Sequence, residues 1–267
     1  MDDVVLYEVS DGIAKITLNR PDQMNTWTGK LGDELQARLG EADRDDEVVV
    51  VVITGAGKAF CAGADLGDGE SGFLPVSADD DGRPRLWPYQ VRKPIIAAVN
   101  GHAVGVGITF SMLCDVRLIA ENAKVQYAMV RRGVVPELAS HVILPRVIGF
   151  SKAAELMLTG RMLSGTEAAE LGLASRAVPA DQVLTEAMSL AADMVRDASP
   201  VALAVSKQLL WQGVTAGVDE MLSREGRVIS SIARMPDAVE GVTAFFERRD
   251  ALWSGSVNES ADYLLES

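Results

Sequence analysis

Residues 48–66 read VVVVVITGAGKAFCAGADL, and this stretch decides the fold. Five consecutive valines and Ile53 form an unbroken β-branched run, which suits a strand covered on both faces. The small residues from Gly55 onward break that run and predict tight turns where the strand ends. The sequence therefore predicts an α/β protein built around a buried strand.

Further elements flank this stretch on both sides. Four more apolar runs predict strands, at Val4–Val9, Ile13–Leu18, Ile95–Val99 and Val116–Ile119. Asp11-Gly12 lies between the first two runs and is a two-residue hairpin signal. Residues 28–43 carry a leucine at every fourth position, which predicts an amphipathic helix.

The second half of the chain is expected to be helical from Ser151 onward. Three helix starts have capping patterns: Ser164 with Glu167, Ser199 before Pro200, and Asp237 with Glu240. An apolar stripe over residues 183–195 predicts a helix that packs on the core or on a neighbouring subunit. We expect a core of residues 1–198 and a helical region of residues 199–267. The glycine- and aspartate-rich residues 67–88 predict a surface loop or lid.

Composition excludes several classes of function. The net charge of −13 and the pI near 4.6 disfavour nucleic acid and anionic membranes as partners. The acidic start, Met1 to Asp3, is unlike a secretory signal, so we expect a cytoplasmic protein. Cys61 and Cys114 lie far apart in sequence, so we expect two packed thiols and no metal site or disulfide framework.

Two segments rich in small residues, 54–66 and 100–107, each join a strand end to a helix start. Free amides at such a start favour an anion or a polarised carbonyl, and two that converge would make an oxyanion hole. On spacing alone, ordinary turns are the commoner explanation. A nucleotide phosphate loop is excluded, because no serine or threonine follows Lys58.

The order and spacing of several motifs are more specific than either segment. They are Leu18-Asn19-Arg20-Pro21, Asn25, the run 57–66, Lys93-Pro94, Ala98-Val99-Asn100-Gly101, Cys114-Asp115, and residues 144–149, 158–161 and 168–173. Together they resemble the enoyl-CoA hydratase/isomerase (crotonase) superfamily over nearly the whole chain. The resemblance implies a spiral of ββα units and a C-terminal helical region that builds homotrimers, often paired into hexamers.

The resemblance also implies an acyl-CoA enzyme that acts through a thioester enolate. The oxyanion amides in that superfamily correspond here to those of Ala64 and Val106. The second position is commonly glycine, so the valine side chain is expected to narrow the acyl pocket.

The catalytic carboxylates depart from the hydratase pattern. The two glutamates of crotonase hydratases correspond here to Thr109 and Met129, so both are absent. Glu137, directly after Pro136, lies where some superfamily members, such as the peroxisomal 3,2-enoyl-CoA isomerases, have an acidic base. Burial beside Met129 and Val130 would make it a stronger base, although a solvated helix-start carboxylate is the simpler structural explanation.

Several residues are candidates for binding coenzyme A, which belongs to the substrate, so no separate cofactor is expected. The resemblance assigns to it Arg20, Lys58, Ala62, Ala64, Asp65, Leu66 and Phe246. Asp65 is also most simply a helix cap. His102 and His141 have no partner at ligand spacing and are expected to be packed or surface residues.

Three functions remain open. The first is isomerisation of 3-enoyl-CoA to 2-enoyl-CoA with Glu137 as the single base. The second is 2-enoyl-CoA hydration, which the family name favours and the missing glutamates disfavour. The third is an acyl-CoA binding subunit without catalysis, because the oxyanion turns could survive the loss of a base.

Overall fold

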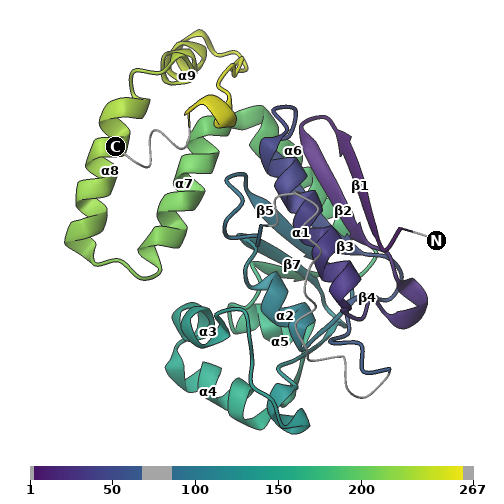
Figure 1. The fold of residues 1–267 in the computed structure, drawn as a ribbon. Coiled ribbons are helices and arrows are strands. Elements are labelled where there is room, and N and C mark those ends of the chain that lie inside the picture. Colours follow the sequence, from purple (N-terminus) through teal and green to yellow (C-terminus); the bar gives the residue numbers. More distant parts are fainter. Residues whose placement is uncertain (1–2, 68–85, 261–267) are drawn as a thin grey trace.

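The computed structural model describes residues 3–67 and 86–260, and its strands form two sheets (Figure 1). The larger sheet has the order β1-β2-β3-β5-β7-β10. Its strands are β1 (Val5–Ser10), β2 (Ile13–Leu18), β3 (Val50–Gly55), β5 (Ile95–Val99), β7 (Val116–Ala120) and β10 (Arg176–Val178). All its neighbours pair in parallel except β1 and β2.

The smaller sheet has the order β4-β6-β8-β9. Its strands are β4 (Ala59–Cys61), β6 (His102–Val104), β8 (Lys124–Gln126) and β9 (Met162–Ser164). From β3 to β8 the chain alternates between the sheets, placing one strand in the larger sheet and the next in the smaller one. This alternation, with α2 (Val106–Ser111) after β6, is the predicted spiral of ββα units.

The predicted hairpin and central strands are confirmed. Asp11 and Gly12 both have positive φ, 50° and 77°, as a tight two-residue turn requires, and Ser10 pairs with Ile13. Every residue of β3 and β5 is buried, so this part of the sheet is covered on both faces.

The first helix also agrees with its prediction. α1 (Gly29–Arg44) begins after Thr28, whose hydroxyl accepts from the Leu31 amide at 3.2 Å. Its leucines at 31, 35 and 39 are fully buried against the strands β1 and β2. Replacing one of them, Leu35, with alanine would remove about 2–5 kcal/mol of stability.

The remaining helices cover the larger sheet or extend beyond it. They are α3 (Ser140–Ile148), α4 (Phe150–Thr159), α5 (Gly165–Glu170), α6 (Val183–Asp197), α7 (Pro200–Gly213), α8 (Val218–Ile232) and α9 (Pro236–Glu247), with short 3-10 turns at Pro21–Gln23 and Met129–Arg132. The predicted stripe of residues 183–195 lies on α6, which packs on β3, β5 and β7. Figure 1 shows α8 and α9 standing away from the sheets.

Two of the three predicted helix caps are confirmed. Ser164 accepts from the Glu167 amide, and Ser199 accepts from the Ala202 amide. The third is wrong, because α9 begins at Pro236 and Asp237 lies inside it. Asp237 is buried and accepts instead from Ser199 Oγ at 2.7 Å and from the amides of residues 254 and 255.

The expectation that the chain is helical from Ser151 onward is also incomplete, since β9 and β10 lie beyond that point. Each has only three residues and pairs with a distant strand, so neither has a local pattern. The predicted loop or lid at residues 67–88 falls mostly outside the described residues.

A buried ion pair joins α7 to the larger sheet. Lys207 Nζ lies 2.9 Å from Asp115 Oδ2 and donates to the Lys93 carbonyl. The other carboxylate oxygen, Asp115 Oδ1, accepts from the Trp211 indole at 2.7 Å. α7 is therefore tied to the end of the larger sheet at which β5 and β7 begin. The predicted division of the chain between residues 198 and 199 stays a prediction.

Candidate active site

The segment of residues 54–66, called here the first glycine turn, follows β3, and the buried side chain of Asn25 holds it in place. Its amide group donates to the carbonyls of Ala56 and Ala59 at 2.9 and 2.8 Å. Its carbonyl oxygen accepts from the Arg20 amide at 2.8 Å. One buried side chain thus sets the path of the turn, a role that the sequence did not reveal.

The second turn follows β5 and packs directly on the first. Asn100 accepts from the Gly55 amide at 3.0 Å and donates to the Gly57 carbonyl at 3.1 Å. A Cβ atom at Gly101 would lie 2.1 Å from the Lys58 carbonyl oxygen, and one at Gly107 would lie 2.1 Å from that of Cys61. The close approach of the two backbones requires glycine at both positions.

The amides of Ala64 and Val106 lie in the two turns where these come together. A Cβ atom at Gly105, just before Val106, would lie 3.7 Å from the Cα of Gly63, just before Ala64. Within the described part of the chain, neither amide donates a hydrogen bond. The amides of Ala64 and Val106 are thus two backbone donors, in adjoining turns, that a ligand can use.

Glu137 lies beside the second turn. Its Oε1 accepts a hydrogen bond of 2.6 Å from the hydroxyl of Thr109 on α2. The same hydroxyl lies 3.3 Å from the Val106 carbonyl oxygen. The structure therefore brings the carboxylate next to one of the two predicted amide donors.

Glu137 is solvated in the single chain and is not buried beside Met129 and Val130, so the burial that would make it a stronger base is not seen. Met129 is buried, but Glu137 itself is exposed. Pro136 takes the buried position in this segment, and left-handed backbone at Leu138 and Ala139 turns the chain into α3. The side chain therefore lies at the surface of the site, with Thr109 as its partner.

An apolar cavity of about 480 Å³ adjoins this segment. Its lining includes Leu138 and Ala139, which directly follow Glu137, and three aromatic side chains, Trp87, Tyr89 and Trp211. The rings of Tyr89 and Trp211 contact each other at a centroid distance of 5.8 Å. The cavity has the size and the apolar lining of a small-molecule site.

Arg20 and Asp65 bind each other. Arg20 Nη2 lies 2.8 Å from Asp65 Oδ2, and this hydrogen bond holds the pKa of Asp65 below its usual value. Asp65 also accepts from the Thr26 hydroxyl and the Gly67 amide. Residues 66 and 67 are not helical, so the predicted helix cap is not seen in the described residues.

The other residues predicted to bind coenzyme A lie in two places. Lys58 is exposed at the first turn and forms no ion pair with a residue that the structure describes. Ala62 and Leu66 flank Ala64 in the same turn, half-buried and exposed respectively. Phe246 is 77% exposed on α9, far from α2 in Figure 1, so a single chain does not bring it to the site.

The histidines and cysteines lie outside this site. His102 accepts from the Lys124 amide, and burial lowers its pKa, while His141 is exposed. Both cysteines are buried free thiols, and burial raises the pKa of each to about 12. Within residues 3–67 and 86–260, no group of three histidine, cysteine or acidic residues is arranged to hold a metal ion. In the same ranges, no helix is long and apolar enough to span a bilayer.

Comparisons with known proteins match nearly the whole chain. A model of the enoyl-CoA hydratase/isomerase family matches residues 8–256. The 2,3-dehydroadipyl-CoA hydratase of Escherichia coli (strain K12) is 35% identical over 242 residues, covering 90% of this chain and 94% of that protein. A probable mitochondrial enoyl-CoA hydratase of Dictyostelium discoideum is also 35% identical over 242 residues, covering 90% and 87%.

Solved structures give the same result. The crystal structure of a probable enoyl-CoA hydratase/isomerase from Mycobacterium abscessus has a TM-score of 0.87 and 36% identity, covering 94% of this chain and 99% of that chain. The enoyl-CoA hydratase from Mycobacterium tuberculosis H37Rv has a TM-score of 0.86 and 30% identity, covering 96% and 100%.

Proposed function

Because the chain belongs to the enoyl-CoA hydratase/isomerase family, we propose that it binds an acyl-CoA thioester and isomerises 3-enoyl-CoA to 2-enoyl-CoA. The observation that carries this proposal is the hydrogen bond between Thr109 and Glu137, which keeps one carboxylate beside the second glycine turn. A double-bond shift needs a single group that removes a proton and returns it.

The proposed reaction has two proton transfers. Glu137 takes a proton from C2 of the thioester, and the electron pair moves onto the thioester oxygen as an enolate. The amides of Ala64 and Val106 donate to that oxygen and stabilise its negative charge. Glu137 then returns the proton to C4, which leaves the double bond between C2 and C3.

Substrate binding is divided between the polar turns and the apolar cavity. The acyl part occupies the cavity lined by Trp87, Tyr89 and Trp211, because only apolar groups are stabilised there. Lys58 is the best placed cation for a coenzyme A phosphate, since Arg20 is already bound to Asp65. No separate cofactor takes part in this reaction.

Hydration of 2-enoyl-CoA is the second candidate, because the relatives that are 35% identical are named hydratases. Two residues disfavour it here. Thr109 and Met129 are both buried and neither can transfer a proton as a carboxylate does. Water addition would therefore need Glu137 to act alone.

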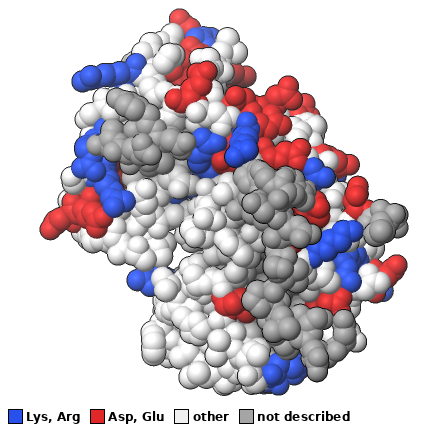
Figure 2. Space-filling model, in the orientation of Figure 1, with Lys and Arg blue, Asp and Glu red and all other residues white. Residues whose placement is uncertain are grey.

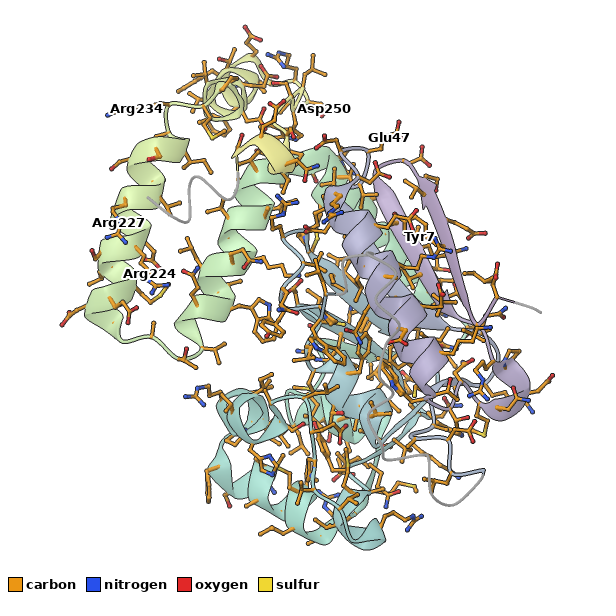
Figure 3. The ribbon with its side chains drawn as sticks, in the orientation of Figure 1. Tyr7, Glu47, Arg224, Arg227, Arg234 and Asp250 are labelled. Atoms are coloured by element: carbon orange, nitrogen blue, oxygen red, sulfur yellow. The ribbon has the colours of Figure 1, made fainter. Side chains whose placement is uncertain are left out.

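The decisive experiment compares purified parent and Glu137→Gln with 3-enoyl and 2-enoyl thioesters. Isomerisation should fall about 10²- to 10⁴-fold in the variant. Glu47→Gln is the matched control, because Glu47 is exposed on the α1–β3 connection, far from α3 (Figure 3). Full isomerisation by Glu137→Gln would refute the base assignment. Robust hydration by the parent would favour the second candidate. Binding of both thioesters without turnover of either would favour a non-catalytic subunit.

We also propose that the protein assembles as a homotrimer or a hexamer. Large apolar side chains are exposed on the outer helices, among them Leu222 and Ile229 on α8 and Phe245 and Phe246 on α9. Neutral residues also dominate the surface over α3 and α4 (Figure 2). Light scattering after gel filtration should give the mass of three or six chains, and a monomer would contradict the proposal.

A further inference from the structure

Thr109 is buried, yet its hydroxyl lies within reach of three oxygen atoms. Glu137 Oε1 is at 2.6 Å, the Val106 carbonyl oxygen at 3.3 Å and the Gly105 carbonyl oxygen at 3.4 Å. A hydroxyl has one hydrogen to donate. The Gly105 oxygen already accepts from the amides of Ile108 and Thr109.

The carboxylate is therefore the partner that takes the hydroxyl hydrogen. Its contact is the shortest of the three, and 2.6 Å is the distance typical of a hydroxyl bound to an ionised carboxylate. Since the bond occupies Oε1, the other carboxylate oxygen, Oε2, is left to exchange a proton with a ligand.

The backbone of Glu137 is fixed independently of Thr109. Its carbonyl oxygen accepts from both the amide and the hydroxyl of Ser140, the first residue of α3. Leu138 and Ala139 hold left-handed conformations with φ of 53° and 55°. Only the exposed side chain is free to rotate, and the terminal torsion of a glutamate has a broad, shallow preference.

We infer that Thr109 is a positioning residue that holds one oxygen of Glu137 so that the other oxygen alone carries the proton. This inference rests on the proposed function. Thr109 is three residues after Val106 on the same helix, so the hydroxyl sets the carboxylate at a constant place relative to the Val106 amide. The same oxygen can then remove a proton from one carbon of the enolate and deliver it to another.

Two substitutions separate the hydroxyl from the packing of Thr109. Thr109→Val keeps the shape and removes the hydroxyl, whereas Thr109→Ser keeps the hydroxyl and removes a buried methyl group. We expect kcat for 3-enoyl-CoA to fall about ten- to a hundred-fold in Thr109→Val, the effect of losing a hydrogen bond to a charged group. KM should stay within about twofold, because the hydroxyl does not bind the substrate.

Thr109→Ser should recover most of kcat even though its thermal stability falls, because a methyl-sized cavity remains in the core. A purely structural role would give the reverse order, with Thr109→Ser the poorer enzyme. Parental kcat in Thr109→Val, or equal losses in the two variants, would overturn the inference.

Glu137→Gln separates this inference from the proposed function. With Glu137 replaced, adding Thr109→Val should lower the residual rate no further, because the two residues act as one unit. If Glu137→Gln is inactive while Thr109→Val keeps the parental kcat, the positioning role of Thr109 is refuted and the base assignment stands. If Glu137→Gln still isomerises the substrate, both the base assignment and the positioning role of Thr109 are refuted.

Discussion

The two glycine turns and the segment around Glu137 meet at one site but are held in different ways. The turns press backbone on backbone, so that a single added carbon at Gly101 or Gly107 would lie 2.1 Å from a carbonyl oxygen. Glu137 is exposed and its carboxylate is fixed by one hydroxyl. The two backbone amides are therefore inseparable from the fold, whereas the proposed base Glu137 can be replaced with little effect on stability.

Gly107→Ala should have the largest effect on the first of these regions. Its Cβ would meet the Cys61 carbonyl oxygen at 2.1 Å, and neither α2 nor β4 can move without disturbing the smaller sheet. We expect little or no folded protein, measured by soluble yield and circular dichroism. Gly226→Ala on α8 is the control, since nothing lies within 4 Å of its added carbon. The control should raise the free energy of unfolding by roughly 0.5–1 kcal/mol. Parental stability of Gly107→Ala would show that the close approach of the two turns is not essential to the fold.

Asn25→Ala should have the next largest effect. It removes three hydrogen bonds and leaves the carbonyls of Ala56 and Ala59 without their donor. Alanine must also adopt the left-handed φ of 54° at this position. We expect a loss of about 3 kcal/mol in urea-induced unfolding, since each buried unpaired polar group costs about 1–3 kcal/mol. A loss of unfolding free energy below about 1 kcal/mol would mean that the turn keeps its conformation without the hydrogen bonds of Asn25.

Asp65→Asn should have a smaller, pH-dependent effect. Arg20 holds the pKa of Asp65 below its usual value in the folded protein, so folding favours the ionised form. Its contribution of about 0.2–1 kcal/mol is present above pH 4 and lost as pH falls through the folded pKa. Unfolding free energies of parent and variant should therefore differ at pH 7 and converge in acid. A constant difference would show that Asp65 acts through packing alone.

Glu137→Gln should have the smallest effect on stability. The side chain is exposed, and the amide can still accept from Thr109. We expect the unfolding free energy to stay within about 0.5 kcal/mol of the parent despite the loss of turnover. A clear loss of stability would show that this segment, like the turns, is part of the framework.

The sequence predicted the elements whose pattern is local. The hairpin at Asp11 and Gly12, the buried strand β3 and the leucine face of α1 each follow from neighbouring residues. The strands β4, β6, β8 and β9 have three residues each and depend on partners far along the chain. No periodicity can be read from three residues, so the second sheet was not predicted, although the family resemblance implied a spiral of ββα units.

The candidate site divides in the same way. The glycine segments and Glu137 could be found by position. Thr109 was noted only as the replacement of a glutamate, because its bond to Glu137 joins residues 28 apart in sequence. The role of Asn25 also depends on two carbonyls more than 30 residues away. Asp237 was mistaken for a cap because its real partners, at residues 199, 254 and 255, are distant in sequence.

The pair of Lys207 and Asp115 determines which parts of the molecule can move relative to one another. Moving α7 away from the sheet would break this ion pair together with the hydrogen bonds from Lys207 to the Lys93 carbonyl and from Trp211 to Asp115. The connection at residues 198 and 199 is therefore no hinge, and α7 belongs mechanically to the sheet. α9 is held to α7 as well, because buried Asp237 accepts from Ser199 Oγ at the start of α7.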